Sequence, residues 1–197
     1  MERWLNEHWV PAALCIAIAL IVLLPVLAMQ WNTAWLFTYG LLPIYMLHQV
    51  EEHTGDLFRK FVNEKVFGGT EGLSHTAVLW INLPGVWGVG LASIYAATFA
   101  GIGWGMSMIH LTLVNAILHI VAAVAWREYN PGLWTALILF VPVGALALVT
   151  VSNSAGVQWF HHAVGIGVAL LIHVAIVVYT RHCAAVIRAR AGAVTSA

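Results

Sequence analysis

Histidine and glutamate side chains gather in one short segment of an otherwise apolar chain. His48, Glu51 and Glu52 lie three and four residues apart, and at about 100° per residue these spacings place them on one face of a helix. An imidazole and carboxylates on one face are able to ligate one metal ion or to bridge two. A purely structural role would leave a carboxylate buried without compensation, which is costly inside a membrane. We therefore interpret this segment as a functional site.

Two later segments carry polar side chains that could join this site. Asn115 and His119 lie four residues apart and share a helical face. His162 and His173 lie eleven residues apart, which is roughly 16 Å along a helix, so they cannot both ligate the same ion. The predicted metal ligands are drawn from His48, Glu51, Glu52, His119, His173 and His162. We predict that Glu51 is a general base and that Asn115 stabilises a developing oxyanion.

The composition determines which elements must position these residues. Of 197 residues, 61% are hydrophobic and only 8% are charged, against roughly 25% in a soluble domain. This predicts an all-α, polytopic membrane helix bundle. The formal net charge of zero removes the cationic surface that binding to nucleic acid requires. Cys15 and Cys183 form no CxxC pair, so a disulfide framework or a thiolate zinc site is not indicated.

About six segments are long and apolar enough to be membrane helices, and together they predict a single transmembrane domain over residues 1–197. They are Pro11 to Met29, Thr33 to His53, His75 to Ala100, Ile102 to Trp126, Leu133 to Val151 and Val157 to Thr180. The connection at about 54–74 is amphipathic, and we expect a helix there on the cytoplasmic leaflet. Residues 190–197 are expected to form a flexible tail.

The basic residues predict the orientation of these helices. All eight fall before the first segment, in the second and fourth connections, or after the last segment: Arg3, Arg59, Lys60, Lys65, Arg127, Arg181, Arg188 and Arg190. The other connections contain no Lys or Arg. By the positive-inside rule, both termini are cytoplasmic.

Counting from these basic residues also gives the depth of the candidate ligands. His119 precedes Arg127 by eight residues, and His173 precedes Arg181 by eight, so both lie roughly 12 Å inside the cytoplasmic interface. The His48 to Glu52 segment reaches the same half of the membrane. Three helices are therefore expected to present ligands at one depth.

The order of these motifs resembles that of a known family. The His48, Glu51 and Glu52 pattern resembles the signature of the HXXEE family of bacterial membrane proteins, which is of unassigned function. Asn115 and His119, then Tyr129, Asn130, Pro131, Gly132 and Thr135, and then His162 to His173, look like the same layout. The resemblance covers most of the chain from His48 to Tyr179 and implies a location in the bacterial inner membrane. It supports the choice of residues but implies no reaction.

Three classes of function remain open on this chemistry. The first is a zinc-type enzyme that hydrolyses a lipid or another apolar or amphiphilic small molecule, with the bilayer as its surroundings. The second is a di-iron oxidase, hydroxylase or desaturase, although the histidine-rich boxes of such enzymes are missing. The third is a proton or cation relay in a transporter, although no inverted repeat is visible. A haem bound by His119 and His173 would leave the glutamates unexplained.

Overall fold

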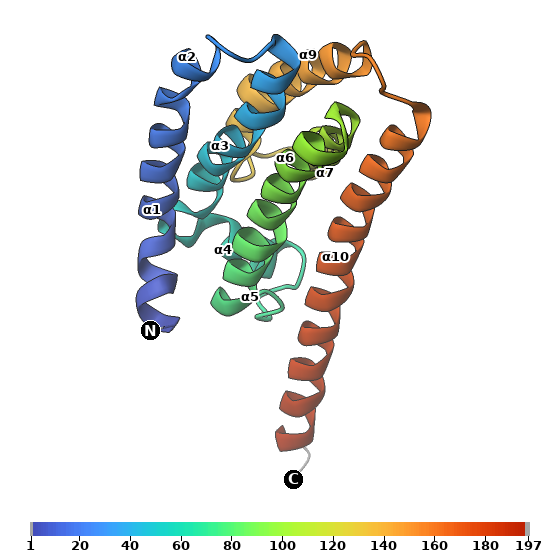
Figure 1. Ribbon diagram of the computed structural model, residues 1–197. Helices are drawn as coiled ribbons and strands as arrows, with labels where there is room; N and C mark the ends of the chain where they lie inside the picture. Colours follow the sequence, from blue (N-terminus) through green and yellow to red (C-terminus); the bar gives the residue numbers. More distant parts are fainter. Residues whose placement is uncertain (1, 196–197) are drawn as a thin grey trace.

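The chain folds as a bundle of helices joined by short connections. The computed structural model describes residues 2–195, and no strand occurs in that range. In chain order the elements are α1 (Glu2–Val22), α2 (Leu24–Leu27), α3 (Thr33–His53), η1 (Thr54–Asp56), α4 (Leu57–Lys65), α5 (His75–Trp80), η2 (Ile81–Trp87), α6 (Gly88–Ala100), η3 (Ile102–Gly105), α7 (Met106–Trp126), α8 (Leu133–Thr135), η4 (Ala136–Phe140), α9 (Val141–Ser152) and α10 (Trp159–Thr195). Figure 1 shows α1 and α10 on opposite flanks of the bundle, with α3, α6 and α7 between them.

Five helical segments in the described residues are long and apolar enough to cross a membrane. They are Trp4–Leu27, His75–Ala100, Ile102–Trp126, Leu133–Ser152 and Trp159–Ala193. The 21-residue helix α3 is not among them, because the polar residues of its second half lower its hydropathy. It packs against α1, α6, α7 and α9, and more than half of its residues are buried. A helix enclosed by other helices can carry polar groups that a lipid-facing helix cannot.

Most of the predicted segments have the expected bounds, and the first and the last are longer. The helix at 33–53 begins and ends as predicted, as do the helical stretches at 75–100 and 102–126. The first helix begins at Glu2 instead of Pro11, and α10 continues to Thr195 instead of ending at Thr180. Arg188 Nη2 donates to Phe67 O over 2.5 Å, so this extension packs on the connection between α4 and α5. The last two residues of the predicted tail lie outside the described residues.

The predicted amphipathic helix is α4, and part of its apolar side packs against the protein. Phe58 and Val62 pack in a cluster with Trp9 and Leu73, whereas we expected the apolar face to lie on the lipid surface. The difference arises because the chain reverses on both sides of α4. Gly55 has φ +66° before the helix, and Gly68 and Gly69 have φ +60° and +86° after it. These turns fold α4 back under the bundle.

The charged connections meet at one end of the bundle. Lys65 Nζ lies 2.8 Å from Glu128 Oε1 and joins α4 to the 127–132 loop. Arg59 Nη1 lies 2.7 Å from Glu71 Oε1 within the connection after α3. The hydrogen bonds of Arg188 bring the last part of α10 to the same end. The basic residues that lie far apart in the sequence are thus neighbours at this end of the fold.

Candidate metal centre

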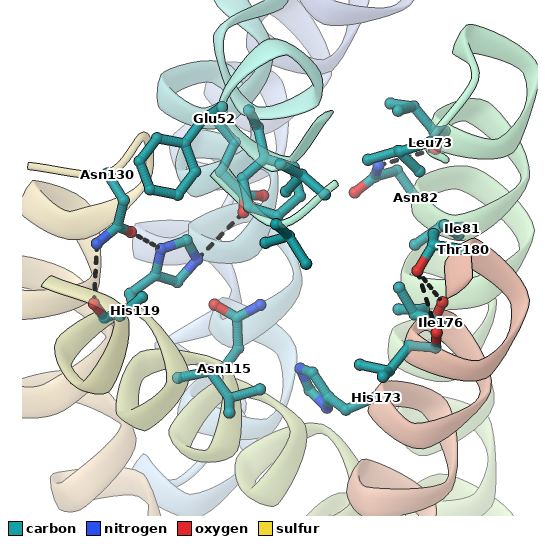
Figure 2. A pocket seen from close by; sticks show the side chains of 18 of the residues that line it. Glu52, Leu73, Ile81, Asn82, Asn115, His119, Asn130, His173, Ile176 and Thr180 are labelled. Carbon is teal, nitrogen blue, oxygen red and sulfur yellow. Dashed lines mark hydrogen bonds and ion pairs between the residues drawn. The ribbon is translucent and has the colours of Figure 1, made fainter. Parts of the chain in front are cut away.

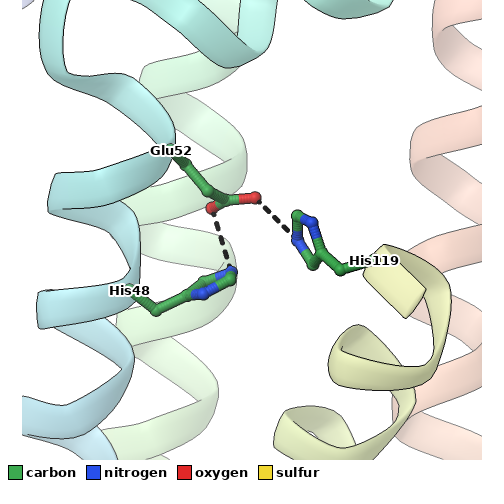
Figure 3. A group of neighbouring side chains, drawn as sticks. All are labelled: His48, Glu52 and His119. Atoms are coloured by element: carbon green, nitrogen blue, oxygen red, sulfur yellow. Dashed lines mark ion pairs between the residues drawn. The ribbon is translucent and has the colours of Figure 1, made fainter. Parts of the chain in front are cut away.

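Helices α3 and α7 bring two imidazoles and one carboxylate together inside the bundle. His48 Nε2 lies 3.5 Å from Glu52 Oε2, and His119 Nε2 lies 3.1 Å from Glu52 Oε1. All three side chains are buried, and one potential ligand atom from each lies within 4.8 Å of the others. Figure 3 shows both rings turned toward the carboxylate of Glu52. The three residues form a group that could hold a metal ion.

The hydrogen bonds of Thr135 determine which nitrogen of His48 is free. Thr135 Oγ1 lies 2.6 Å from Glu51 Oε2, to which it donates, and 2.8 Å from His48 Nδ1. Because its one proton goes to the carboxylate, the hydroxyl accepts from Nδ1–H of His48. In the neutral imidazole, Nε2 then carries a lone pair. This atom is buried and has no hydrogen-bond partner among the described residues.

Asn130 orients His119 in the same manner. Asn130 Nδ2 donates to His119 O over 2.9 Å, which assigns Oδ1 as the acceptor end of the amide. His119 Nδ1 donates to this Oδ1 over 2.6 Å. The Nε2 atom of the neutral ring is therefore an acceptor, and it faces Glu52. Outer hydrogen bonds of this kind fix the tautomer of metal-binding histidines in proteins.

Three acceptor groups thus converge on one small space. Two imidazole lone pairs and a carboxylate repel one another unless a metal ion lies between them or one ring is protonated. Two ligands at 2.0–2.1 Å from a tetrahedral zinc ion lie about 3.3–3.4 Å apart, close to the 3.1 and 3.5 Å observed here. Two histidines and one glutamate are also the ligands of one class of catalytic zinc site. The residues present therefore fit a divalent metal ion.

Gly132 brings the backbone of the 127–132 loop directly against this group. Its φ is +99°, a conformation that favours glycine. A Cβ atom at this position would lie 2.6 Å from His119 Cε1 and 2.8 Å from both Glu52 Cγ and His48 Cε1. Only a residue without a side chain fits here, and the loop closes one side of the group.

Glu51 does not join its neighbour Glu52 at this group. Its Oε1 accepts from Tyr129 Oη over 2.8 Å and from Trp134 N over 3.1 Å. Its Oε2 accepts from the backbone N of Thr135 over 2.7 Å and from the hydroxyl of the same residue. Burial, followed by the hydrogen bond to Glu51, raises the pKa of Tyr129 to about 12, so this hydroxyl remains a donor at neutral pH. The Glu51 carboxylate thus holds the loop that orients His48.

The structure places the other predicted site residues apart from the three ligands. Asn115 and His173 line a cavity beside the group, and His173 Nδ1 donates to Ala169 O of its own helix over 2.8 Å. His162 is not brought to the group. Its Nδ1 lies 3.3 Å from His110 Nε2, where α10 meets the early part of α7.

The cavity that Glu52 and His119 border has a volume of about 340 Å³ and mostly apolar walls. Figure 2 shows Glu52, His119 and Asn130 on one side of it and His173, Ile176 and Thr180 of α10 on the other. Helix α4 and the start of the 75–100 stretch complete its walls. Small-molecule sites in proteins have such volumes and such a small number of polar groups in an apolar lining. Glu52 and His119 are therefore within reach of an apolar ligand.

Two contributions to the site were not predicted from the spacing of residues. Helical spacing turns the residue after Glu52 to another face, yet His53 Nε2 lies 3.6 Å from Glu52 Oε2. Its φ of −108° departs from the helical value at the end of α3 and turns the side chain back. The role of Asn130 as the partner of His119 was also missed. The resemblance drew attention to this residue, but its contact depends on the loop conformation.

Comparisons with known proteins give one result. A model of a family described as a protein of unknown function with HXXEE motif matches residues 39–147. The match includes the three candidate ligands, Glu51 and the 127–132 loop, and it ends before α10 begins. No curated protein and no solved structure matches the chain.

Proposed function

The chain belongs to the HXXEE family, whose function is unknown, and from the geometry of its buried group we propose that it is a metal-dependent membrane hydrolase. The proposed metal ligands are His48, Glu52 and His119, and the proposed ion is a single divalent metal, with zinc favoured. The proposed substrate is a lipid or another amphiphilic small molecule that enters the cavity. One observation carries the proposal: two imidazole nitrogens and a carboxylate, all buried, converge at distances that suit ligands of one metal ion.

The reaction would take place at the side of the group that borders the cavity. A divalent ion held there would polarise a carbonyl group and supply a water molecule of lowered pKa. Asn115 borders the cavity, and its amide N–H is the proposed donor to the oxyanion that forms. His173 donates its Nδ1–H to Ala169 O, so its neutral Nε2 is an acceptor. We propose that His173 Nε2 accepts the proton of the attacking water. His173 then donates this proton to the leaving group.

Glu51 has a positioning role in this proposal. All of its hydrogen bonds lead to the 127–135 segment, and it acts on His48 through Thr135. This differs from the role of general base that its place in the motif predicted. The other two functions have less support. A di-iron centre needs further carboxylates, and among the described residues Glu52 is the one carboxylate at the group. A proton relay would require the group to bind a proton in place of a metal.

The proposal includes the orientation of the chain in the membrane. We propose that α3 crosses the membrane with the five more apolar helices, so that six spans leave both termini in the cytoplasm. The gathering of basic residues at one end of the bundle supports this orientation through the positive-inside rule. The family resemblance supports the bacterial inner membrane as the location.

Elemental analysis of purified protein tests the metal centre. We expect about one zinc per chain, and we expect His48→Ala and His119→Ala to lose most of it because a two-ligand site binds zinc weakly. His8→Ala is the matched control, since His8 is exposed and contacts Trp4. Two irons per chain would favour the oxidase, and no metal in a folded parent would favour the proton relay. Equal metal in all variants would remove these residues from the site.

A further inference from the structure

Helix α10 packs closely against η3 and the start of α7 at the end of the bundle away from the charged connections. A Cβ atom at Gly165 would lie 2.7 Å from Met106 O, and one at Gly103 would lie 2.7 Å from His161 Cγ. The residues of α7 and α10 that line the cavity lie further along each helix, at 111–126 and 172–181. The cavity therefore lies where these two helices no longer pack backbone to backbone.

This part of the cavity is open toward the surroundings of the bundle. Leu118 and Trp126 of α7 are 45% and 42% exposed, and Val177 of α10 is 48% exposed, although all three line the cavity. In a membrane protein, exposed apolar side chains on spanning helices face lipid tails. The cavity thus has an apolar opening between α7 and α10 through which an alkyl chain could enter from the bilayer.

The guanidinium group of Arg181 lies at the edge of this opening. Arg181 is exposed and is the last residue of α10 in the cavity wall, and the described part of the chain offers it no hydrogen bond or ion pair. Two other guanidinium groups at this end are already engaged, since Arg59 pairs with Glu71 and Arg188 donates to Phe67 O. A guanidinium group binds carboxylate and phosphate oxygens in a bidentate manner.

We infer that the cavity binds a single-chain amphiphile with an anionic headgroup, held by Arg181 at the mouth. Its alkyl chain lies against the apolar walls, and its reactive group reaches the level of Glu52 and His119. Arg181 follows His173 by eight residues, which is roughly 12 Å along α10. The alkyl chain of the ligand must therefore be at least that long. Only the reaction of this ligand rests on the proposed function. Its binding does not, because we expect the amphiphile to bind with or without turnover.

Binding of matched probes to the full-length protein in nanodiscs of zwitterionic lipid tests the inference. The probes are laurate, dodecyl phosphate, dodecanol and dodecyltrimethylammonium, which share a chain length and differ in headgroup. We expect at least one anionic probe to bind more tightly than the alcohol and the cation. Arg181→Gln should weaken that anionic probe about 5- to 10-fold, in the range of one charge-assisted contact, and leave the alcohol unchanged. The two anionic probes distinguish a carboxylate from a phosphate ligand.

Two further variants make the result specific to the cavity. Arg190→Gln removes a charge from the same helix nine residues further on, which is about half a turn away from the face of Arg181, so we expect no change. Val177→Trp should weaken all chain-bearing probes because it fills the opening. Equal effects of Arg181→Gln and Arg190→Gln, or no preference for anions, would overturn the inference. Metal analysis of the same samples separates this outcome from failure of the metal centre.

Discussion

Glu51 and Glu52 are neighbours in the chain, yet their carboxylates have different surroundings. Glu52 faces two imidazole nitrogens that are acceptors in their neutral form. Glu51 accepts four hydrogen bonds, all from Tyr129, Trp134 and Thr135. The Glu52 carboxylate therefore lies where it could share a metal ion with the two rings, whereas the Glu51 carboxylate is engaged by hydrogen-bond donors of the 129–135 segment. Substitutions of the two glutamates are therefore expected to affect the site in different ways.

Replacing Glu51 by Gln tests its positioning role. A glutamine has one acceptor oxygen and an NH2 group that donates, so donors of the Tyr129–Thr135 segment would face another donor. Thr135 would then no longer hold Nδ1–H of His48 in place. We expect zinc affinity, measured by competition with a chromophoric chelator, to fall about 10- to 100-fold, as is typical when outer hydrogen bonds of a metal site are lost.

A matched carboxylate at the same end of the bundle is the control for this variant. Glu128 pairs with Lys65 at the surface and does not contact the candidate ligands, so Glu128→Gln should keep the affinity of the parent. If Glu51→Gln instead binds zinc normally and loses turnover, Glu51 is the general base that its place in the motif predicted, and our positioning role is wrong.

Among the helices, hydropathy and spacing predicted most of the bounds because a lipid-facing helix must be apolar over a fixed length. The polar helix α3 was found by the same pattern because its first half is apolar. The length of α10 was not predictable, since it depends on the contact of Arg188 with a distant connection. The direction of the apolar face of α4 was also not predictable, because it depends on the glycine turns at 55 and 68–69.

The candidate site was also predicted only in part. His48 and Glu52 are one helical turn apart, so spacing alone brought them together, and the depth count brought His119 to their level. The depth count also included His173, which the structure places across the cavity from His119. Depth along a membrane gives no information on the rotation or distance of a helix, and this limits prediction from the sequence. The loop that supplies Asn130 and Gly132 has no periodic pattern from which its contacts could be read.

The 127–132 loop is tested by adding a methyl group at Gly132. Gly132→Ala places a Cβ atom within 2.8 Å of all three candidate ligands, in addition to the cost of a positive φ. We expect a lower melting temperature and a loss of most of the bound zinc. Gly156→Ala is the control, because Gly156 has φ +84° but nothing lies within 4 Å of its added Cβ. It should lower the melting temperature and leave zinc in place; equal zinc in both variants would show that the loop does not close the site.

Across the whole molecule, charged residues gather at one end of the bundle. The connections at 54–74 and 127–132 and the last turns of α10 meet at one end. Arg181 of α10 belongs to the cavity wall. The opposite connections at 30–32 and 152–158 carry no basic residue. If the charged end is cytoplasmic, a substrate reaches the site from the inner leaflet.

Cysteine labelling in intact cells tests this orientation. Cys15 and Cys183 are first replaced by alanine, since both are free thiols. Ala155→Cys, in the uncharged connection before α10, should then react with a membrane-impermeant maleimide added outside, because residue 155 is exposed. Residue 64 is also exposed but lies on α4, so Glu64→Cys should react only after the membrane is permeabilised. The reverse pattern would place the charged end outside, and the site would then be reached from the outer leaflet. Labelling of both cysteines from outside would place the two connections on the same side of the membrane, which six spans do not allow.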